Sequence, residues 1–247
     1  MPLLFLMTSV ILVPVLTYAQ GGPPMVTDDP GTVENGHWEI NIASLTASNY
    51  NQNLIQFPYF DINYGLGSRL QLKVETGWVI RRDHVAPAQG GADTVLAGTK
   101  FRFLDEETAG VAVATYPQFQ FHHFFSSKDP ELTTPGNQLI LPLEFCKNIG
   151  NWAINPEIGY LYSTAASDEF LYGVVFAFEK AKPWEPLFEV HANTLLDGTG
   201  TTTLLNFGFR YTISPLMNLL VAAGHTITHT EGSSTELDTY LGLQLEL

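Results

Sequence analysis

Apolar and polar side chains alternate in segments that recur from Gly36 to the end of the chain. The clearest segment runs from Arg69 to Ile80. One face carries Leu70, Leu72, Val74, Thr76, Trp78 and Ile80, and the other carries Arg69, Gln71, Lys73 and Glu75. Because successive side chains of a strand point to opposite faces, this pattern predicts a β-strand with one apolar and one polar face.

Twelve such segments can be counted. They begin near residues 36, 53, 69, 93, 109, 137, 151, 168, 184, 201, 215 and 237. Each is long enough to cross a bilayer, which takes about 9 to 11 tilted residues. The last segment ends on the final residue of the chain, with Leu241, Leu243, Leu245 and Leu247 on one face.

The composition fits neither a soluble domain nor a helical membrane protein. Charged residues make up 15% of the chain, against roughly 25% in soluble domains. Aromatic residues reach 12%, yet the mean hydropathy is only +0.06. A barrel with lipid outside and water inside would have this combination of few charges, many aromatic residues and near-zero hydropathy. An open sheet edge is costly in lipid, so the first strand must pair with the last. We expect an all-β fold, a transmembrane antiparallel up-and-down β-barrel of about 12 strands.

The connections alternate in length, as short periplasmic turns and longer extracellular loops would. The tight set is 65–68, 105–107, 148–150, 180–183 and 214–215, and the longer set includes 82–92, 124–136 and 230–236. Two links of the longer class, near 165–167 and 197–200, are short. The alternation predicts that both chain ends lie in the periplasm.

An apolar run from Leu3 to Leu16 precedes the first segment, and Thr17-Tyr18-Ala19 follows it. The run is too short for a spanning helix, and its small-x-small ending is typical of a signal peptide, although no Lys or Arg precedes it. We expect a signal peptide over residues 1–19, a periplasmic N-terminal arm over 20–35 and an outer-membrane barrel over 36–247.

Four prolines fall inside the expected strands, at Pro58, Pro117, Pro142 and Pro156. Proline cannot donate a hydrogen bond to a sheet, so each predicts a bulge or a local break. Tyrosine and tryptophan concentrate near strand ends, where membrane interfaces favour aromatic side chains. The expected aromatic girdle includes Trp38, Tyr64, Trp78, Trp152, Tyr160, Trp184 and Tyr211.

The inward face carries charges of both signs. The expected lumen-lining set is Arg69, Lys73, Glu75, Lys100, Arg102, Glu144, Glu157, Glu189 and Arg210. These residues could line a water path and set its selectivity, or pair with one another and plug a narrow lumen. Twelve strands lie between the filled barrels of eight strands and the open channels of sixteen, so width does not decide.

No catalytic, metal or cofactor site is expected. His122 and His123 lie near Ser126, Ser127 and Asp129, but no Gly-x-Ser-x-Gly motif is present. The expected function is a passive narrow pore or uptake channel for small molecules. A non-conducting barrel with a charge-plugged lumen is the alternative, and a lipid-acting enzyme is the weaker hypothesis. His225 and His229 would stand about 13 Å apart on a strand. Asp28 and Asp29 alone are weak evidence for Ca²⁺. The glycine spacing of a P-loop is missing before Gly98-Thr99-Lys100. Cys146, the single cysteine, is expected to be a packed and inert side chain.

The expected partners follow from the same features. Outer-membrane lipid covers the apolar faces, barrel-insertion machinery reads the closing strand, and small-molecule solutes enter the lumen. Leu247 stands where bacterial barrels usually end in an aromatic residue, which is expected to weaken recognition by that machinery. A net charge of −14 with 11 Lys and Arg argues against nucleic acid.

Three stretches resemble a known family, the bacterial outer-membrane proteins labelled MetA-pathway of phenol degradation and often described as transporters. They are Val26–Pro30 with Gly36–Ile40, Asn63–Leu72, and Ala92–Phe103, and Phe207–Ser214 is a looser match. The resemblance implies an outer-membrane barrel and little about its chemistry. It implies no catalytic residue.

Overall fold

The structure is a computed structural model that describes residues 22–83, 87–129, 132–179, 182–228 and 236–247. The expected signal peptide lies outside these residues. Within them, fourteen strands form one continuous sheet, and all their pairings are antiparallel. The strands are β1 (Trp38–Ser48), β2 (Gln52–Leu66), β3 (Leu70–Asp83), β4 (Gln89–Ala92), β5 (Val95–Leu104), β6 (Ala112–Thr115), β7 (Gln118–Phe121), β8 (Gln138–Ile149), β9 (Trp152–Ser163), β10 (Glu169–Phe178), β11 (Trp184–Leu195), β12 (Thr201–Ser214), β13 (Met217–Thr228) and β14 (Leu237–Glu246).

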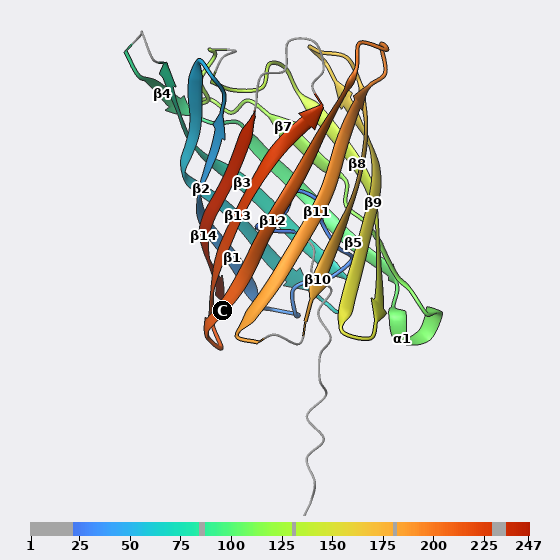
Figure 1. The fold of residues 1–247 in the computed structure, drawn as a ribbon. Helices are drawn as coiled ribbons and strands as arrows, with labels where there is room; N and C mark the ends of the chain where they lie inside the picture. The colour runs from blue at the N-terminus through green and yellow to red at the C-terminus, as the bar shows by residue number, and fades with distance from the viewer. Residues whose placement is uncertain (1–21, 84–86, 130–131, 180–181, 229–235) are drawn as a thin grey trace, which may run out of the picture.

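The sheet closes into a barrel because the first strand pairs with the last. Ten residue pairs join β1 to β14, from Glu39 with Glu246 to Ser48 with Leu237. The barrel wall has twelve strands, since β6 and β7 are two halves of one crossing and β4 only extends one rim. Figure 1 shows the strands tilted around a common axis. The predicted up-and-down barrel of twelve strands is therefore confirmed.

The two ends of the barrel differ as predicted. Five of the strand connections at one end are short or carry a single helical turn, and the C-terminus lies at this end, which we call the short-turn end (Figure 1). The longer connections gather at the other end, the long-loop end. Each wall strand begins within three residues of its predicted start.

Two connections hold structure that the sequence reading missed. Within the expected loop 82–92, β4 folds back on β3 as a short hairpin. The expected tight turn at 105–107 contains α1 (Glu106–Ala109), a single helical turn that is capped by Gly110 with φ of 78°. Among the described residues, no helix has the length and apolar character needed to cross a membrane.

The four prolines behave in two ways. Pro58 lies in a bulge, where the register between β2 and β3 shifts between Gln56 and Tyr59, and Pro117 separates β6 from β7. These two predictions are confirmed. Pro142 and Pro156 lie within β8 and β9, which keep one register along their length, so the predicted breaks there are wrong. Each of these two residues still occupies a regular place opposite a partner, Gly159 and Val174 respectively.

The alternation of side chains separates the outer face from the lumen. On β9, exposed Trp152, Ile158 and Tyr160 alternate with buried Asn155 and Glu157. The same alternation places Leu241 and Leu243 of β14 outward, with Tyr240 and Gln244 inward. The exposed apolar side chains cover the outside of the wall, whereas buried polar side chains are concentrated inside. Cys146 is buried in the apolar cluster on the inner side, as expected.

Candidate functional site: a lumen crossed by the N-terminal arm

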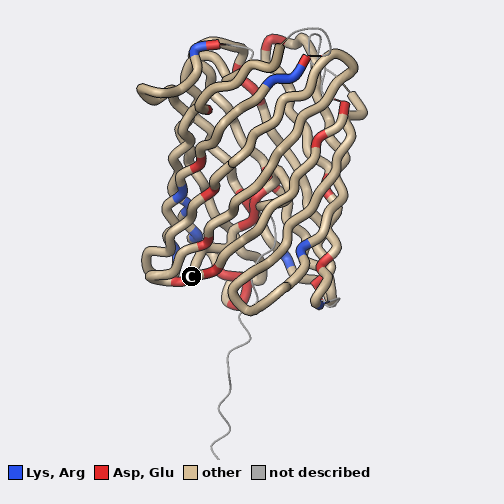
Figure 2. Tube along the Cα trace, turned by 90° about the vertical axis from the view of Figure 1, so that its left-hand side faces the viewer, with Lys and Arg blue, Asp and Glu red and all other residues tan. Residues whose placement is uncertain are grey.

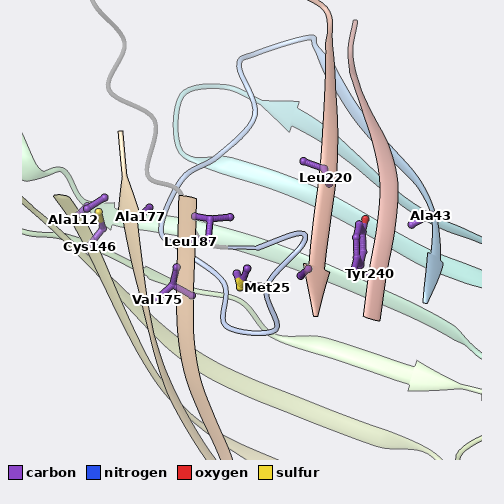
Figure 3. Packing of buried hydrophobic residues seen from close by; sticks show 11 residues of the cluster. Met25, Ala43, Ala112, Cys146, Val175, Ala177, Leu187, Leu220 and Tyr240 are labelled. Carbon is purple, nitrogen blue, oxygen red and sulfur yellow. The ribbon is translucent and has the colours of Figure 1, made fainter. Parts of the chain in front are cut away.

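Residues 22–35, the N-terminal arm, lie inside the barrel. The arm meets the wall at the short-turn end, where Asn35 bridges to Gly65 and the Gly67 N–H donates to Asn35 Oδ1. Its first residues form a tight loop in which the Gly22 N–H donates to the Thr27 carbonyl. Met25 packs in the lumen cluster, with Leu187 and Val175 on one side and Tyr240 on the other (Figure 3). Whether this end faces the periplasm stays a prediction.

A carboxylate on β11 holds the tip of the arm. Glu189, which is fully buried, accepts the backbone N–H groups of Val26 at 3.1 Å and Thr27 at 2.5 Å. The Thr27 hydroxyl lies 3.1 Å from Nδ1 of His191. On β9, Glu157 accepts the backbone N–H of Asp28 at 3.1 Å. These contacts hold residues 26–28 of the arm against β9 and β11.

Lys100 of β5 connects the arm to the opposite wall. Its ammonium donates to Asp28 Oδ1 at 2.9 Å and to the carbonyl of Asp29. It also lies 3.4 Å from the Glu144 carboxylate and 4.6 Å from the centre of the Tyr116 ring. Only 2% of Lys100 is exposed. A buried charge is tolerated when it is paired and hydrogen-bonded, and the arm supplies part of that pairing.

A second lysine extends the charged cluster. Lys73 of β3 forms ion pairs with Glu75 on its own strand and with Asp61 of β2, at 3.7 Å for the latter. The Asp61 carboxylate also accepts hydrogen bonds from Asn41 and Asn63. We call Asp28, Asp61, Lys73, Glu75, Lys100 and Glu144 the central charge cluster.

Arg210 of β12 fixes the beginning of the arm. Its Nε donates to the carbonyl of Pro23 at 3.0 Å, and its Nη1 donates to Glu185 at 3.2 Å. Glu189 and Arg210 therefore bind different backbone groups of the arm. Glu189 accepts from N–H groups, and Arg210 donates to carbonyl groups.

Three wall glycines make room for the arm. A Cβ added at Gly173 would stand 2.1 Å from Thr27 Oγ1, and one at Gly208 would stand 2.6 Å from the end of Met25. A Cβ at Gly65 would stand 2.0 Å from the carbonyl oxygen of Glu34. Such distances are far below van der Waals contact, so any larger residue would displace the arm or the wall.

The arm lies between two cavities. The larger, of about 560 Å³, is lined by residues nearer the long-loop end, such as Leu54, Leu204 and Tyr240. The smaller, of about 320 Å³, is lined by residues nearer the short-turn end, including Glu39 and Asn218. Four residues line both cavities: Gly22, Pro23, Asp28 and Lys73. A solute that crossed the lumen would have to pass this segment or move it.

The predicted lumen charges divide into two groups. The structure places Lys73, Glu75, Lys100, Glu144, Glu157, Glu189 and Arg210 on the inner wall, around the arm. Arg69 and Arg102 instead lie at the short-turn end, where both pair with Asp105 and Arg69 is half exposed. Residues that the sequence reading left out of the set include Asp28, Asp61, Tyr116, Glu185 and His191. Asp61, Glu185 and His191 alternate with outward apolar residues, so the period-2 pattern could have found them.

The acidic residues outnumber the basic ones by 25 to 11 over the whole chain. Figure 2 shows acidic positions along the height of the wall as well as at its ends. The larger cavity is lined by four carboxylates, those of Asp28, Glu75, Glu157 and Asp238, and by one lysine, Lys73. Acidic side chains thus outnumber basic ones in the lining of the larger cavity.

The expected girdle residues lie on the outer wall. At the short-turn end, Trp38 packs against Tyr64 and Trp184 against Tyr211, each pair with ring centres 4.6 Å apart. Trp152 begins β9 at the same end. Nearer the long-loop end are Trp78 and Tyr160, both more than a third exposed.

The residues considered for catalysis or metal binding make other contacts in the structure. The Ser126 hydroxyl donates to the Asp93 carbonyl and accepts the backbone N–H of His123. The His123 ring accepts the N–H of Phe125. Within the described residues these contacts do not form a Ser–His–acid relay. His225 is exposed on β13, His229 lies outside the described residues, and no group of three metal-binding side chains was found in the described part.

No family model matches the chain, and no curated protein matches it. Among solved structures, the chain is similar to the COG4313 outer membrane channel from Pseudomonas putida F1, with 11% identity, a TM-score of 0.64, and 92% of this chain and all of that chain covered. It is also similar to the NanC porin, with 7% identity, a TM-score of 0.64 and coverage of 84% and 100%. The KdgM porin matches at 8% identity with a TM-score of 0.59, over 83% and 98% of the two chains. These likenesses show a shared β-barrel fold.

Proposed function

We propose that this protein is a passive channel for small solutes in the outer membrane of a Gram-negative bacterium, with its own N-terminal arm as the constriction. The observation that carries the proposal is a closed barrel with an apolar exterior and a cavity on each side of the arm. The similar solved structures support it, since they are described as porins or as a channel. The resemblance to the MetA-pathway family stays a prediction and agrees with a transport role.

The charge of the lumen gives the channel an expected preference. One similar structure is a KdgM porin in complex with oligogalacturonate, which is a polyanion. Here the larger cavity has an excess of carboxylates, and Lys73 and Lys100 already serve internal partners. We therefore expect neutral and cationic solutes to pass more readily than anions.

Recording from single refolded barrels in a planar bilayer tests the proposal. Discrete current steps and a reversal potential on the cation-selective side under a KCl gradient are the expected result. A barrel that migrates as folded on a heat-modifiability gel, yet carries no current at any voltage, would contradict a channel.

A non-conducting barrel is the second candidate, and one specific observation favours it. The arm and the central charge cluster fill the middle of the lumen with packed and paired side chains. In that case the arm is a permanent part of the core, and the barrel serves to anchor its loops. The two candidates differ in whether weakening the contacts of the arm releases current.

A further inference from the structure

The wall of the larger cavity contains polar atoms that no described group satisfies. Asn206 of β12 and Tyr240 of β14 line this cavity, and each is more than nine-tenths buried. Asn206 Oδ1 and the Tyr240 hydroxyl have no hydrogen-bond partner among the described residues. Buried polar groups are nearly always hydrogen-bonded, so two such atoms on one cavity wall point to a ligand.

The sheet register places a carboxylate beside them. Asn206 lies opposite Gly224 of β13, and Gly224 lies opposite Asp238 of β14. Asn206 and Asp238 therefore flank a residue without a side chain, with about 10 Å between their backbones at 4.8 Å per strand. A Cβ at Gly224 would stand 2.8 Å from Leu204 Cδ1 and 3.1 Å from Asn206 Oδ1, so an apolar side chain and an amide oxygen both lie over this glycine.

The carboxyl group of Asp238 is unpaired among the described residues. In the described part of the chain its carboxylate makes no hydrogen bond or ion pair, unlike Glu189, whose oxygens accept from Val26, Thr27 and Asn206. Glu75 is paired with Lys73, and Glu157 accepts the N–H of Asp28. Among the carboxylates of this cavity, Asp238 is thus the one best placed to meet a ligand.

The surroundings of these three residues define the shape of the ligand. Leu45, Leu54 and Leu204 line the same cavity, together with the aromatic rings of Tyr59 and Tyr240. Apolar walls suit a hydrocarbon body, and aromatic faces attract cations. A carboxylate and an amide oxygen accept hydrogen bonds and repel anions, whereas an ammonium group only donates.

We propose that the recess formed by Asn206, Gly224, Asp238 and Tyr240 binds a small organic cation, an alkyl- or arylammonium, by its ammonium group. The hydrocarbon part lies against the leucines of the cavity wall. The inference that the recess binds a solute during its passage rests on the proposed channel function. Binding itself does not depend on conduction.

Three probes of equal size separate charge from shape: 2-phenylethylammonium, 2-phenylethanol and phenylacetate. Calorimetric titration of the full mature chain in nanodiscs measures the Kd of each. We expect the ammonium to bind at least ten times more tightly than the alcohol, and phenylacetate not to bind. Equal Kd values for all three, tighter binding of phenylacetate or no binding of the ammonium would overturn the proposal.

Two variants locate the site. Asp238→Asn keeps the shape of the side chain and removes its charge, so the Kd for the ammonium is expected to rise at least tenfold. Tyr240→Phe removes one hydroxyl and is expected to raise it by a few fold. Glu107→Gln is the matched control, since it removes one exposed negative charge at the short-turn end. An unchanged Kd for Asp238→Asn, or an equal loss for Glu107→Gln, would overturn the proposal.

The calorimetric result is independent of the channel result. If the barrel binds the ammonium but never conducts, the recess stands and the channel function fails. If it conducts with cation selectivity but binds none of the three probes, the channel stands and the recess fails.

Discussion

Lys100 on β5 and Asp28 in the N-terminal arm form an ion pair of 2.9 Å between groups 72 positions apart in the sequence. The pair joins the arm to the barrel wall, and Asp28 lines both cavities. Because Lys100 also lies beside Glu144, the arm and the wall share one buried cation.

Removing that cation is expected to destabilise the folded barrel. Lys100→Met leaves Asp28 and Glu144 without their shared partner, and breaking a buried pair from one side costs about 3–5 kcal/mol. Thermal unfolding followed by heat-modifiability measures the effect. Arg69→Met is the control, since its half-exposed pair with Asp105 is worth about 0–1 kcal/mol. Equal losses in the two variants would show that burial of Lys100 is unimportant.

Weakening the carboxylate that holds the tip of the arm is expected to open the lumen. In Glu189→Gln the side chain loses its charge, and one of its two oxygens becomes an N–H₂ group that cannot accept from Val26 or Thr27. Hydrogen bonds to charged groups contribute about 1.5–3 kcal/mol each. We expect the mean single-channel conductance to rise at least twofold. Asp197→Asn, in an exposed turn, should leave it unchanged. A conductance equal to that of the parent chain would show that the docked arm does not limit the current.

The contact between Asp28 and Lys100 is expected to hold down to about pH 4 and to be lost at lower pH. Burial raises the pKa of Asp28, but Lys100 and Lys73 lower it more, so it falls below its usual value, which is about 3.9. A carboxyl group with a lowered pKa stabilises the docked state above its unfolded pKa and loses this effect as the pH falls through its folded pKa. Protonation of Asp28 should therefore add a rise in conductance below about pH 4.

Two variants assign this pH dependence. Asp28→Asn should remove the acid step and give a raised conductance at every pH. Asp29→Asn should keep the step, because burial shifts the pKa of Asp29 upward and its carboxylate accepts from Gly31 within the arm. A step that survives in Asp28→Asn would assign it to another group.

Filling the space under the arm is expected to displace it without changing any charge. Gly173→Ala puts a Cβ 2.1 Å from Thr27 Oγ1, so we expect a conductance increase similar to that of Glu189→Gln. Adding Thr27→Ala removes that oxygen and should restore part of the parental conductance. If the second change restores nothing, the clash lies elsewhere, for example at His191 Nδ1.

The sequence predicted the wall well and the contents of the lumen poorly. Alternation over Arg69–Ile80 and similar segments predicts both the strand and the face that it buries, because successive side chains of a strand point to opposite faces. The arm has no such period, and its contacts are made largely by backbone groups with Glu189, Glu157 and Arg210. Its nearest sequence signal is a set of inward-facing glycines, at Gly65, Gly173 and Gly208, which could equally mark bulges.

Two errors have local physical causes. Arg69 follows the alternation of β3 but stands before its first paired residue, so its side chain reaches the Asp105 turn and not the lumen. Pro142 was expected to break β8, but β8 is continuous. The interruption lies in the neighbouring crossing of the wall. β6 and β7 are interrupted there at Tyr116 and Pro117, and the Pro142 carbonyl accepts from the Tyr116 N–H.

Deleting residues 22–33 and recording single channels tests most directly whether the arm is the constriction. Residues 34–37, which meet Gly65, remain in place, and a heat-modifiability gel verifies that the barrel is folded. We predict a conductance several times that of the chain with its N-terminal arm, with cation selectivity retained. A folded, arm-less barrel with the same current as the full chain, or with none, would contradict the account.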